Sequence, residues 1–134
     1  MQANQNIATI QELYAAFGRG DIPGLVERLA PDIVWENPGP AHISYFGTHR
    51  GRQAVLKNIF EFVGANFDVQ AFQPTDFLAS GDKVVVLIHM EVVLRPTGKR
   101  VVQDLAHAWT LKNGLPVHLR DHQDNFALAA AIGN

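Results

Sequence analysis

Apolar side chains recur at helical spacing in the first half of the chain. One stripe runs every three or four residues from Ile7 to Phe17, and a Gly-Arg-Gly segment then ends the pattern. Asp21 is typical of a helix N-cap and, with Pro23 in the first turn, predicts a second short helix. The same apolar spacing predicts a third helix over residues 52–63.

The second half of the chain alternates apolar and polar residues, as strands do. A short strand is predicted over residues 33–37, closed by Pro38-Gly39-Pro40 and followed by a loop over residues 41–50. Four longer strands are predicted over residues 68–78, 83–95, 100–111 and 115–125. Because the helices come first and an antiparallel meander last, the pattern indicates an α+β fold, in a single domain over residues 1–134.

The register of the last hairpin decides which side chains share a face of the sheet. A three-residue loop ending at Gly114 pairs Leu105 with Asp121 and His107 with Leu119, and it keeps that face largely apolar. A two-residue Asn-Gly turn would instead mix an apolar row with a charged one. We therefore expect the three-residue loop.

The preceding hairpin allows two registers. The same loop type places His89 and Glu91 on the face of His107 and Asp121, whereas a four-residue loop places an all-apolar row of the same strand there. The pattern alone leaves both open. With the first register, the apolar row lies on the outer face of the sheet, where a patch of this kind needs a partner. This predicts a two-fold homodimer through Val84, Val86, Ile88, Met90, Ala106 and Ala108.

The amino-acid composition excludes several classes of function for this chain. The 134 residues include no cysteine, which excludes disulfides, thiolate metal sites and a cysteine nucleophile. The formal charge is −2 without a basic stripe, so neither a nucleic acid nor an anionic membrane is an expected partner. His118 and His122 are spaced too widely along a strand to bind one metal ion, and we expect no metal and no cofactor. The first residues lack the features of a signal peptide, so a soluble, cytoplasmic protein is expected.

Ionisable and polar groups are expected to project into the apolar inner face: Asp121, His107, His89, Glu91 and Asn37. An apolar cavity raises the pKa of a carboxyl group toward the working range of an acid or base, and an imidazole already titrates there. The arrangement suits proton transfer. Buried Asp and His residues are also common as purely structural hydrogen-bonding groups, and that alternative stays open.

Short motifs follow one another along nearly the whole chain: Tyr14-Ala15-Ala16-Phe17, Gly20-Asp21, Leu29 to Trp35, Asn37-Pro38, Gly51-Arg52, Ser80-Gly81-Asp82, Thr97-Gly98, His107-Ala108-Trp109, Asn113-Gly114 and Asp124. In this order the sequence resembles the SnoaL-like polyketide cyclases of the nuclear-transport-factor-2-like superfamily, to which ketosteroid isomerases and limonene epoxide hydrolases also belong. The resemblance implies N-terminal helices packed on a curved antiparallel sheet, which forms a cone around an internal pocket.

The resemblance also implies site residues. SnoaL-like cyclases pair a His at the position of His107 with an acid/base Asp at the position of Asp121, and both are present. The three functional positions of ketosteroid isomerases hold Leu13, Asn37 and His107 here. Because Asn37 cannot abstract a proton, steroid-type isomerisation by that mechanism is not expected. The functional positions of limonene epoxide hydrolases hold His89, Glu91, Asp121, Asn37 and Trp35, of which only Asp121 and Asn37 match.

We therefore expect a cofactor-independent acid/base enzyme that acts on a small apolar carbonyl compound, which is cyclic if the aromatic residues contact it. Asp121 would be the base, His107 its partner and Asn37 a polar anchor, with Glu91 and His89 in support. The expected substrate contacts are Trp35, Trp109, Leu105, Gln103, Tyr14, Phe17, Leu119 and Phe60. The alternatives are epoxide hydrolysis and a non-catalytic ligand-binding or dimerisation module.

Overall fold

A computed structural model describes residues 2–133 of the chain. The helices are α1 (Gln2–Gly18), α2 (Ile22–Glu27), α3 (Arg52–Val55), the π-helical segment η1 (Leu56–Glu61), α4 (Phe62–Asn66) and α5 (Asn125–Ile132). The strands are β1 (Val34–Asn37), β2 (Gly47–Arg50), β3 (Phe67–Ser80), β4 (Lys83–Leu94), β5 (Arg100–Lys112) and β6 (Leu115–His122). The predicted α+β fold is confirmed.

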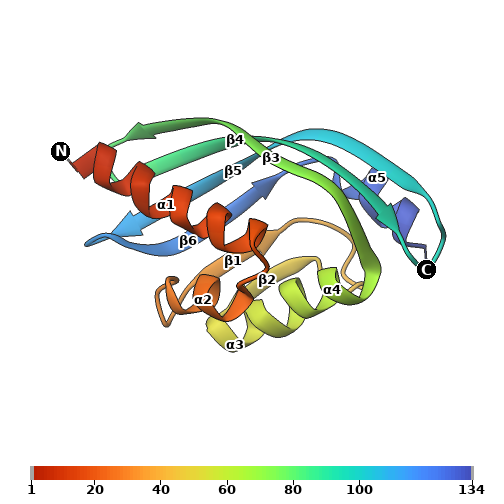
Figure 1. Cartoon of the computed structure of the whole chain (residues 1–134). Coiled ribbons are helices and arrows are strands. Elements are labelled where there is room, and N and C mark those ends of the chain that lie inside the picture. The colour runs from red at the N-terminus through yellow and green to blue at the C-terminus, as the bar shows by residue number, and fades with distance from the viewer. Residues whose placement is uncertain (1, 134) are drawn as a thin grey trace.

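The six strands form one curved sheet in the order β2-β1-β6-β5-β4-β3 (Figure 1). All neighbours are antiparallel except β1 and β6, which pair in parallel. Helix α1 lies along the concave face, and α2 with the continuous α3–η1–α4 helix closes the wide end. Two register shifts interrupt the edge strand β3, one of them next to Pro74, which edge strands and bulges tolerate. The bulges allow β3 to bend around α1.

The turn between β5 and β6 has two residues, not the three that the sequence analysis predicts. Asn113 and Gly114 both have positive φ angles, 51° and 78°, as a type I′ hairpin turn requires. A bulge beside Thr110 then shifts the register by one residue, so that His107 pairs with Asp121 rather than with Leu119. The predicted pairs are therefore wrong, but the bulge restores the predicted face.

Strands β4 and β5 adopt the register that a four-residue loop gives. Ile88 pairs with Leu105 and His89 pairs with Asp104, so the expected inward placement of His89 and Glu91 is wrong. The apolar row turns inward instead and is at most 5% exposed: Val84, Val86, Ile88 and Met90. Each such side chain contributes roughly 1.5–3 kcal/mol when it is buried, which decides the register.

This register also corrects the predicted interface. The four buried residues of β4 cannot contact a partner, and only Ala106 and Ala108 of the predicted set lie on the outer face of the sheet, opposite Leu87 and Val85. The dimer itself stays a prediction.

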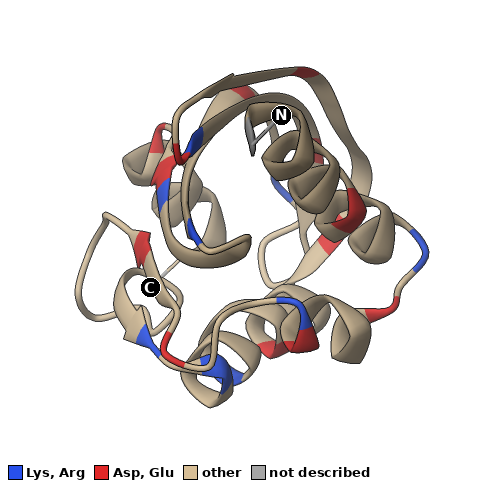
Figure 2. Ribbon diagram, turned by 90° about the vertical axis from the view of Figure 1, so that its left-hand side faces the viewer, with Lys and Arg blue, Asp and Glu red and all other residues tan. Residues whose placement is uncertain are grey.

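Two elements differ from the predicted outline. Residues 47–50 of the predicted loop form β2 beside β1, and the last predicted strand ends at His122. Helix α5 follows, because the Asp124 side chain accepts a hydrogen bond from the Ala127 N–H and caps its start. Figure 2 shows charged residues spread over several elements rather than gathered on one face. None of the helices formed by residues 2–133 is long and apolar enough to cross a membrane.

Candidate functional site

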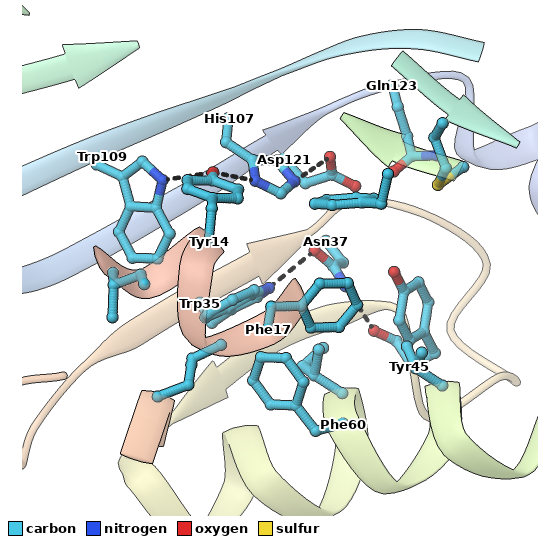
Figure 3. Close-up of a pocket in the computed structure, with 16 residues that line it drawn as sticks. Tyr14, Phe17, Trp35, Asn37, Tyr45, Phe60, His107, Trp109, Asp121 and Gln123 are labelled. Atoms are coloured by element: carbon cyan, nitrogen blue, oxygen red, sulfur yellow. Dashed lines mark hydrogen bonds and ion pairs between the residues drawn. The ribbon is translucent and has the colours of Figure 1, made fainter. Parts of the chain in front are cut away.

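A cavity of about 80 Å³ lies between the concave face of the sheet and the helices (Figure 3). Its wall is mostly apolar: Leu13, Phe17, Leu25, Trp35, Ile59, Phe60, Val63, Phe72, Met90 and Trp109. The polar residues on the wall are Tyr14, Asn37, Tyr45, His107, Asp121 and Gln123. A small number of polar groups in an apolar hollow is typical of a site that binds and orients a small molecule.

Asp121 on β6 is the acidic group of the cavity, and its residue is only 3% exposed. His107 Nε2 lies 3.5 Å from Asp121 Oδ1, across the strand pair that the β5–β6 register creates. Asn125 Nδ2, at the start of α5, lies 3.4 Å from Asp121 Oδ2 and also donates to the Pro38 carbonyl. The carboxylate therefore has polar neighbours, but its contacts with His107 and Asn125 are long for hydrogen bonds.

A chain of hydrogen bonds fixes the ring of His107. Trp109 Nε1 donates to Tyr14 Oη at 2.9 Å, and Tyr14 Oη lies 2.7 Å from His107 Nδ1. Because an indole N–H only donates, the Tyr14 hydroxyl accepts from Trp109 and gives its own proton to His107 Nδ1. The proton of the neutral imidazole is then on Nε2, which faces Asp121.

Gln123 adds an amide beside the carboxylate. With its nitrogen turned toward Asp121 it donates to the two carboxylate oxygens at 2.9 and 3.2 Å. Turned the other way, it donates to Gln103 Oε1 at 3.1 Å and presents its oxygen to Asp121. Gln103 itself is held by both the N–H and the carbonyl of Asp124. The Gln123 amide can thus accompany either protonation state of the Asp121 carboxyl group.

Asn37 connects the cavity to the loop between β1 and β2. Its Oδ1 accepts from Trp35 Nε1 at 3.2 Å, and its Nδ2 donates to the Tyr45 carbonyl, also at 3.2 Å. The same carbonyl oxygen lies 3.0 Å from His49 Nε2, whose other ring nitrogen is paired with Asn58. Asn37 therefore positions the Tyr45 loop as well as lining the cavity.

Both tyrosines of the cavity keep their protons. Burial raises the pKa of the Tyr14 phenol far above its ordinary value, and the negative charge of Asp121 adds to this effect. Burial and the charge of Asp121 raise the pKa of the Tyr45 phenol in the same way. Each phenol is therefore a hydrogen-bond donor rather than a base.

The structure brings together most of the residues that the sequence analysis selects. Asp121, His107 and Asn37 meet at the cavity, and five of the expected substrate contacts line it as well: Tyr14, Phe17, Trp35, Phe60 and Trp109. The other three expected contacts, Leu105, Leu119 and Gln103, do not line it. The two leucines are buried within the sheet core, and Gln103 bonds Asp124 and Gln123 instead.

His89 and Glu91 lie outside, because the observed register of β4 turns them to the outer face. His89 Nε2 lies 2.8 Å from Glu91 Oε2, and its Nδ1 lies 2.7 Å from Asp104 Oδ1. Glu91 also pairs with Arg100. The expected support of Asp121 by these two residues is therefore wrong. Within residues 2–133, no group of three or more His, Asp and Glu side chains is placed to hold a metal ion.

Sequence reasoning missed eight cavity residues, four of them aliphatic residues of the helices: Gln123, Tyr45, Phe72, Met90, Leu13, Leu25, Ile59 and Val63. Gln123 follows Asp121 by two positions, so strand alternation carried a signal for it. The inward position of Met90 is what the four-residue loop predicts for this strand, and the sequence pattern left that loop open as an alternative. Tyr45 lies in an irregular loop whose path no periodicity predicts.

Comparisons with known proteins agree with this architecture. The sequence model of the SnoaL-like domain family matches residues 10–119 of this chain. An NTF2-like protein from Burkholderia pseudomallei is 30% identical, with a TM-score of 0.87 over 97% of this chain and 98% of that one. TerC, co-crystallised with polyporic acid, is 28% identical, with a TM-score of 0.84 over 97% and 99%.

Bal32a, from a soil-derived mobile gene cassette, is 27% identical, with a TM-score of 0.81 over 98% of both chains. A comparison with curated proteins finds no match. The family match spans most of the chain and agrees with the cone-shaped sheet and its internal cavity. The chain therefore belongs to the SnoaL-like family of the NTF2-like fold.

Proposed function

We propose that this protein is a cofactor-independent acid/base catalyst of the isomerase or cyclase type, with a small, largely apolar carbonyl compound as its substrate. The observation that carries the proposal is the Asp121 carboxylate, which is 3% exposed, lines an apolar cavity and faces the imidazole of His107. A carboxylate in this setting can exchange a proton with a carbon acid without competition from bulk water.

The chemistry begins with an acidic C–H bond next to the carbonyl group. Asp121 takes the proton, the C–H electron pair becomes a C=C double bond to the carbonyl carbon, and the C=O π pair moves onto the carbonyl oxygen, which yields an enolate and a neutral Asp121. The proton then returns to another carbon in an isomerisation, or to the product oxygen after a new C–C bond in a cyclisation. His107, through its Nε2–H, would orient the Asp121 carboxyl group in both steps.

The aromatic wall of the cavity favours a cyclic substrate. TerC, one of the similar structures, was co-crystallised with polyporic acid. Aromatic side chains of this chain line the cavity on several sides, and Phe17, Trp35 and Phe60 would pack on the faces and edges of such a ring. A small cyclic ketone with an acidic C–H bond next to its carbonyl group is therefore the substrate class that we propose.

Epoxide hydrolysis gains no support from the geometry. That reaction would need an acid for the epoxide oxygen, and Glu91, which the sequence analysis assigns to this step, is on the outer face of the sheet. Because Glu91 is not in the cavity to act as this acid, proton transfer from carbon by Asp121 is the better-supported reaction.

The test is hydrogen exchange at carbon, which needs no knowledge of the product. Proton NMR in deuterated water would follow the loss of α-hydrogens from cyclohexanone and 1-indanone. We expect the Asp121→Asn variant to lose about 10²–10⁴-fold of the catalysed rate, the usual contribution of a general base. Asp104→Asn, a substitution of an exposed carboxylate on the outer face, is the control and should keep the wild-type rate.

Two outcomes would contradict the proposal. Exchange at the wild-type rate in Asp121→Asn would remove Asp121 from the role of base. A wild-type protein that accelerates exchange in neither ketone, although it binds them, would favour a non-catalytic ligand-binding module. Melting temperatures of both variants within a few degrees of the wild type would show that the comparison is between folded proteins.

A further inference from the structure

The Tyr45 hydroxyl is a hydrogen-bond donor without an acceptor among residues 2–133. Tyr45 is 8% exposed and lines the same cavity as Asp121. The hydrogen bonds found at Tyr45 are made by its backbone carbonyl, with Asn37 and His49. Figure 3 shows its hydroxyl pointing from the loop toward the side of the cavity that carries Asp121 and Gln123. Because Tyr45 lines the cavity, a bound molecule with an oxygen atom at this position can accept the hydrogen bond that the protein leaves open.

The surroundings of Tyr45 hold this donor in place. Its ring contacts three phenylalanine rings, with centroid separations of 5.2 Å to Phe46, 5.3 Å to Phe62 and 5.5 Å to Phe67. The two hydrogen bonds to its carbonyl fix the backbone of the same residue. The hydroxyl is thus preorganised, which is the property that makes a donor effective toward a developing charge.

The hydroxyl of Tyr14, the other phenol of the cavity, already makes hydrogen bonds within the protein. Tyr14 donates to His107 Nδ1 and accepts from Trp109, so both roles of its hydroxyl are filled within the protein. Tyr45 keeps its proton, since burial and the Asp121 charge both raise the pKa of its phenol. Of the two tyrosines, only Tyr45 is therefore available to donate to a bound molecule.

We propose that Tyr45 is a catalytic residue that donates a hydrogen bond to the carbonyl oxygen of the substrate. The proposal rests on the proton transfer proposed for Asp121. As Asp121 takes the α-proton, the C–H electron pair delocalises onto the carbonyl oxygen, and the Tyr45 O–H stabilises the negative charge that forms there without transferring its own proton. The substrate would then lie with its acidic C–H bond toward β6 and its carbonyl oxygen toward the Tyr45 loop.

Binding of 4-nitrophenol tests this role without turnover. Its phenolate carries the charge of an enolate on a ring of suitable size, and its ionisation is visible by absorbance. The Asp121→Asn variant has a neutral side chain, as Asp121 does after it has taken the proton, and we expect this variant to bind the phenolate more tightly than the wild type. Adding Tyr45→Phe should weaken phenolate binding by roughly tenfold to a hundredfold, the value of a hydrogen bond to a charged group.

Nitrobenzene, which lacks the phenol oxygen, is the matched control ligand, and Tyr45→Phe should leave its affinity within about twofold, because no hydrogen bond to it is lost. Equal phenolate binding with and without the Tyr45 hydroxyl would overturn the proposal. Absence of saturable phenolate binding in Asp121→Asn would overturn it as well.

A second measurement covers the reaction itself. In the exchange assay, the single Tyr45→Phe variant should lose about 10²–10³-fold in rate at saturating ketone, as removal of an oxyanion donor does. Exchange at the wild-type rate in Tyr45→Phe, together with its loss in Asp121→Asn, would reject the role of Tyr45 and leave the proposed function intact. Failure of exchange in the wild type would instead reject the proposed function, while the binding comparison would still decide the role of the Tyr45 donor.

Discussion

At the scale of single residues, Tyr14 and Tyr45 share a cavity but differ in their hydrogen bonds. Tyr14→Phe removes the partner of both Trp109 Nε1 and His107 Nδ1, and we expect it to lower the free energy of unfolding by about 1–3 kcal/mol. Tyr45→Phe removes a donor that has no acceptor, so we expect a change within about 0.5 kcal/mol. Urea unfolding of the two variants measures the contrast, and equal losses would contradict the assigned hydrogen bonds.

At the scale of elements, sequence periodicity predicted most helices and strands, because burial of an apolar stripe or row dominates their formation. It did not predict β2, whose four residues form a strand only by pairing with β1, or α5, which depends on the Asp124 cap. For Asp121 and His107 the requirement of one apolar face predicted the correct side of the sheet, although the predicted turn and residue pairs were wrong and a bulge restores that face. The prediction was wrong for His89 and Glu91, because a loop that is one residue longer moves every side chain of β4 to the opposite face of the sheet.

His89 and Glu91 form a charged cluster with Asp104 and Arg100 that joins β4 to β5 on the outer face. This cluster predicts how the stability of the protein depends on pH. Hydrogen bonds with Glu91 and Asp104 raise the pKa of His89 above its ordinary value of 6.5, and His89 followed by Arg100 lowers the pKa of Glu91 below 4.5. The His89 contribution to stability is complete below pH 6.5 and is lost as pH rises through its raised pKa. The Glu91 contribution is complete above pH 4.5 and is lost as pH falls through its lowered pKa.

Both contributions are therefore complete between pH 4.5 and 6.5. We expect the difference in melting temperature between the wild type and His89→Gln to be greatest in this window, and to shrink at higher pH and in high salt, since the groups are exposed. Substitution of His122 by Gln, on the outer face of β6, is the control. A difference that grows steadily above the raised pKa of His89 would show that the ion pairs are not its source.

At the scale of the whole molecule, the helices cover the concave face of the sheet, and apolar side chains remain on its outer face, where Leu78 is 56% and Leu87 is 39% exposed. On the neighbouring strand Ala106 pairs with Leu87 and Ala108 pairs with Val85, which in turn pairs with Leu78, so these five side chains form one apolar stripe. Ion pairs border this stripe: His89, Glu91 and Arg100 lie beyond Leu87 along β4 and β5, and Glu36, His118 and Arg120 lie on the β6 side of Ala108. Because each cluster contains both signs of charge, little net repulsion opposes contact between two copies of this face.

The two-fold homodimer therefore stays a prediction, now through the outer stripe instead of the buried row of β4. Leu87→Lys places a charge in the stripe, and we expect it to shift the protein from dimer to monomer in sedimentation equilibrium, because desolvating an unpaired ammonium group opposes association. Leu115→Lys changes a residue of similar exposure at the tip of the β5–β6 hairpin, away from the stripe, and should leave the dimer intact. A wild type that sediments as a monomer at every concentration, or equal effects of the two substitutions, would exclude this interface.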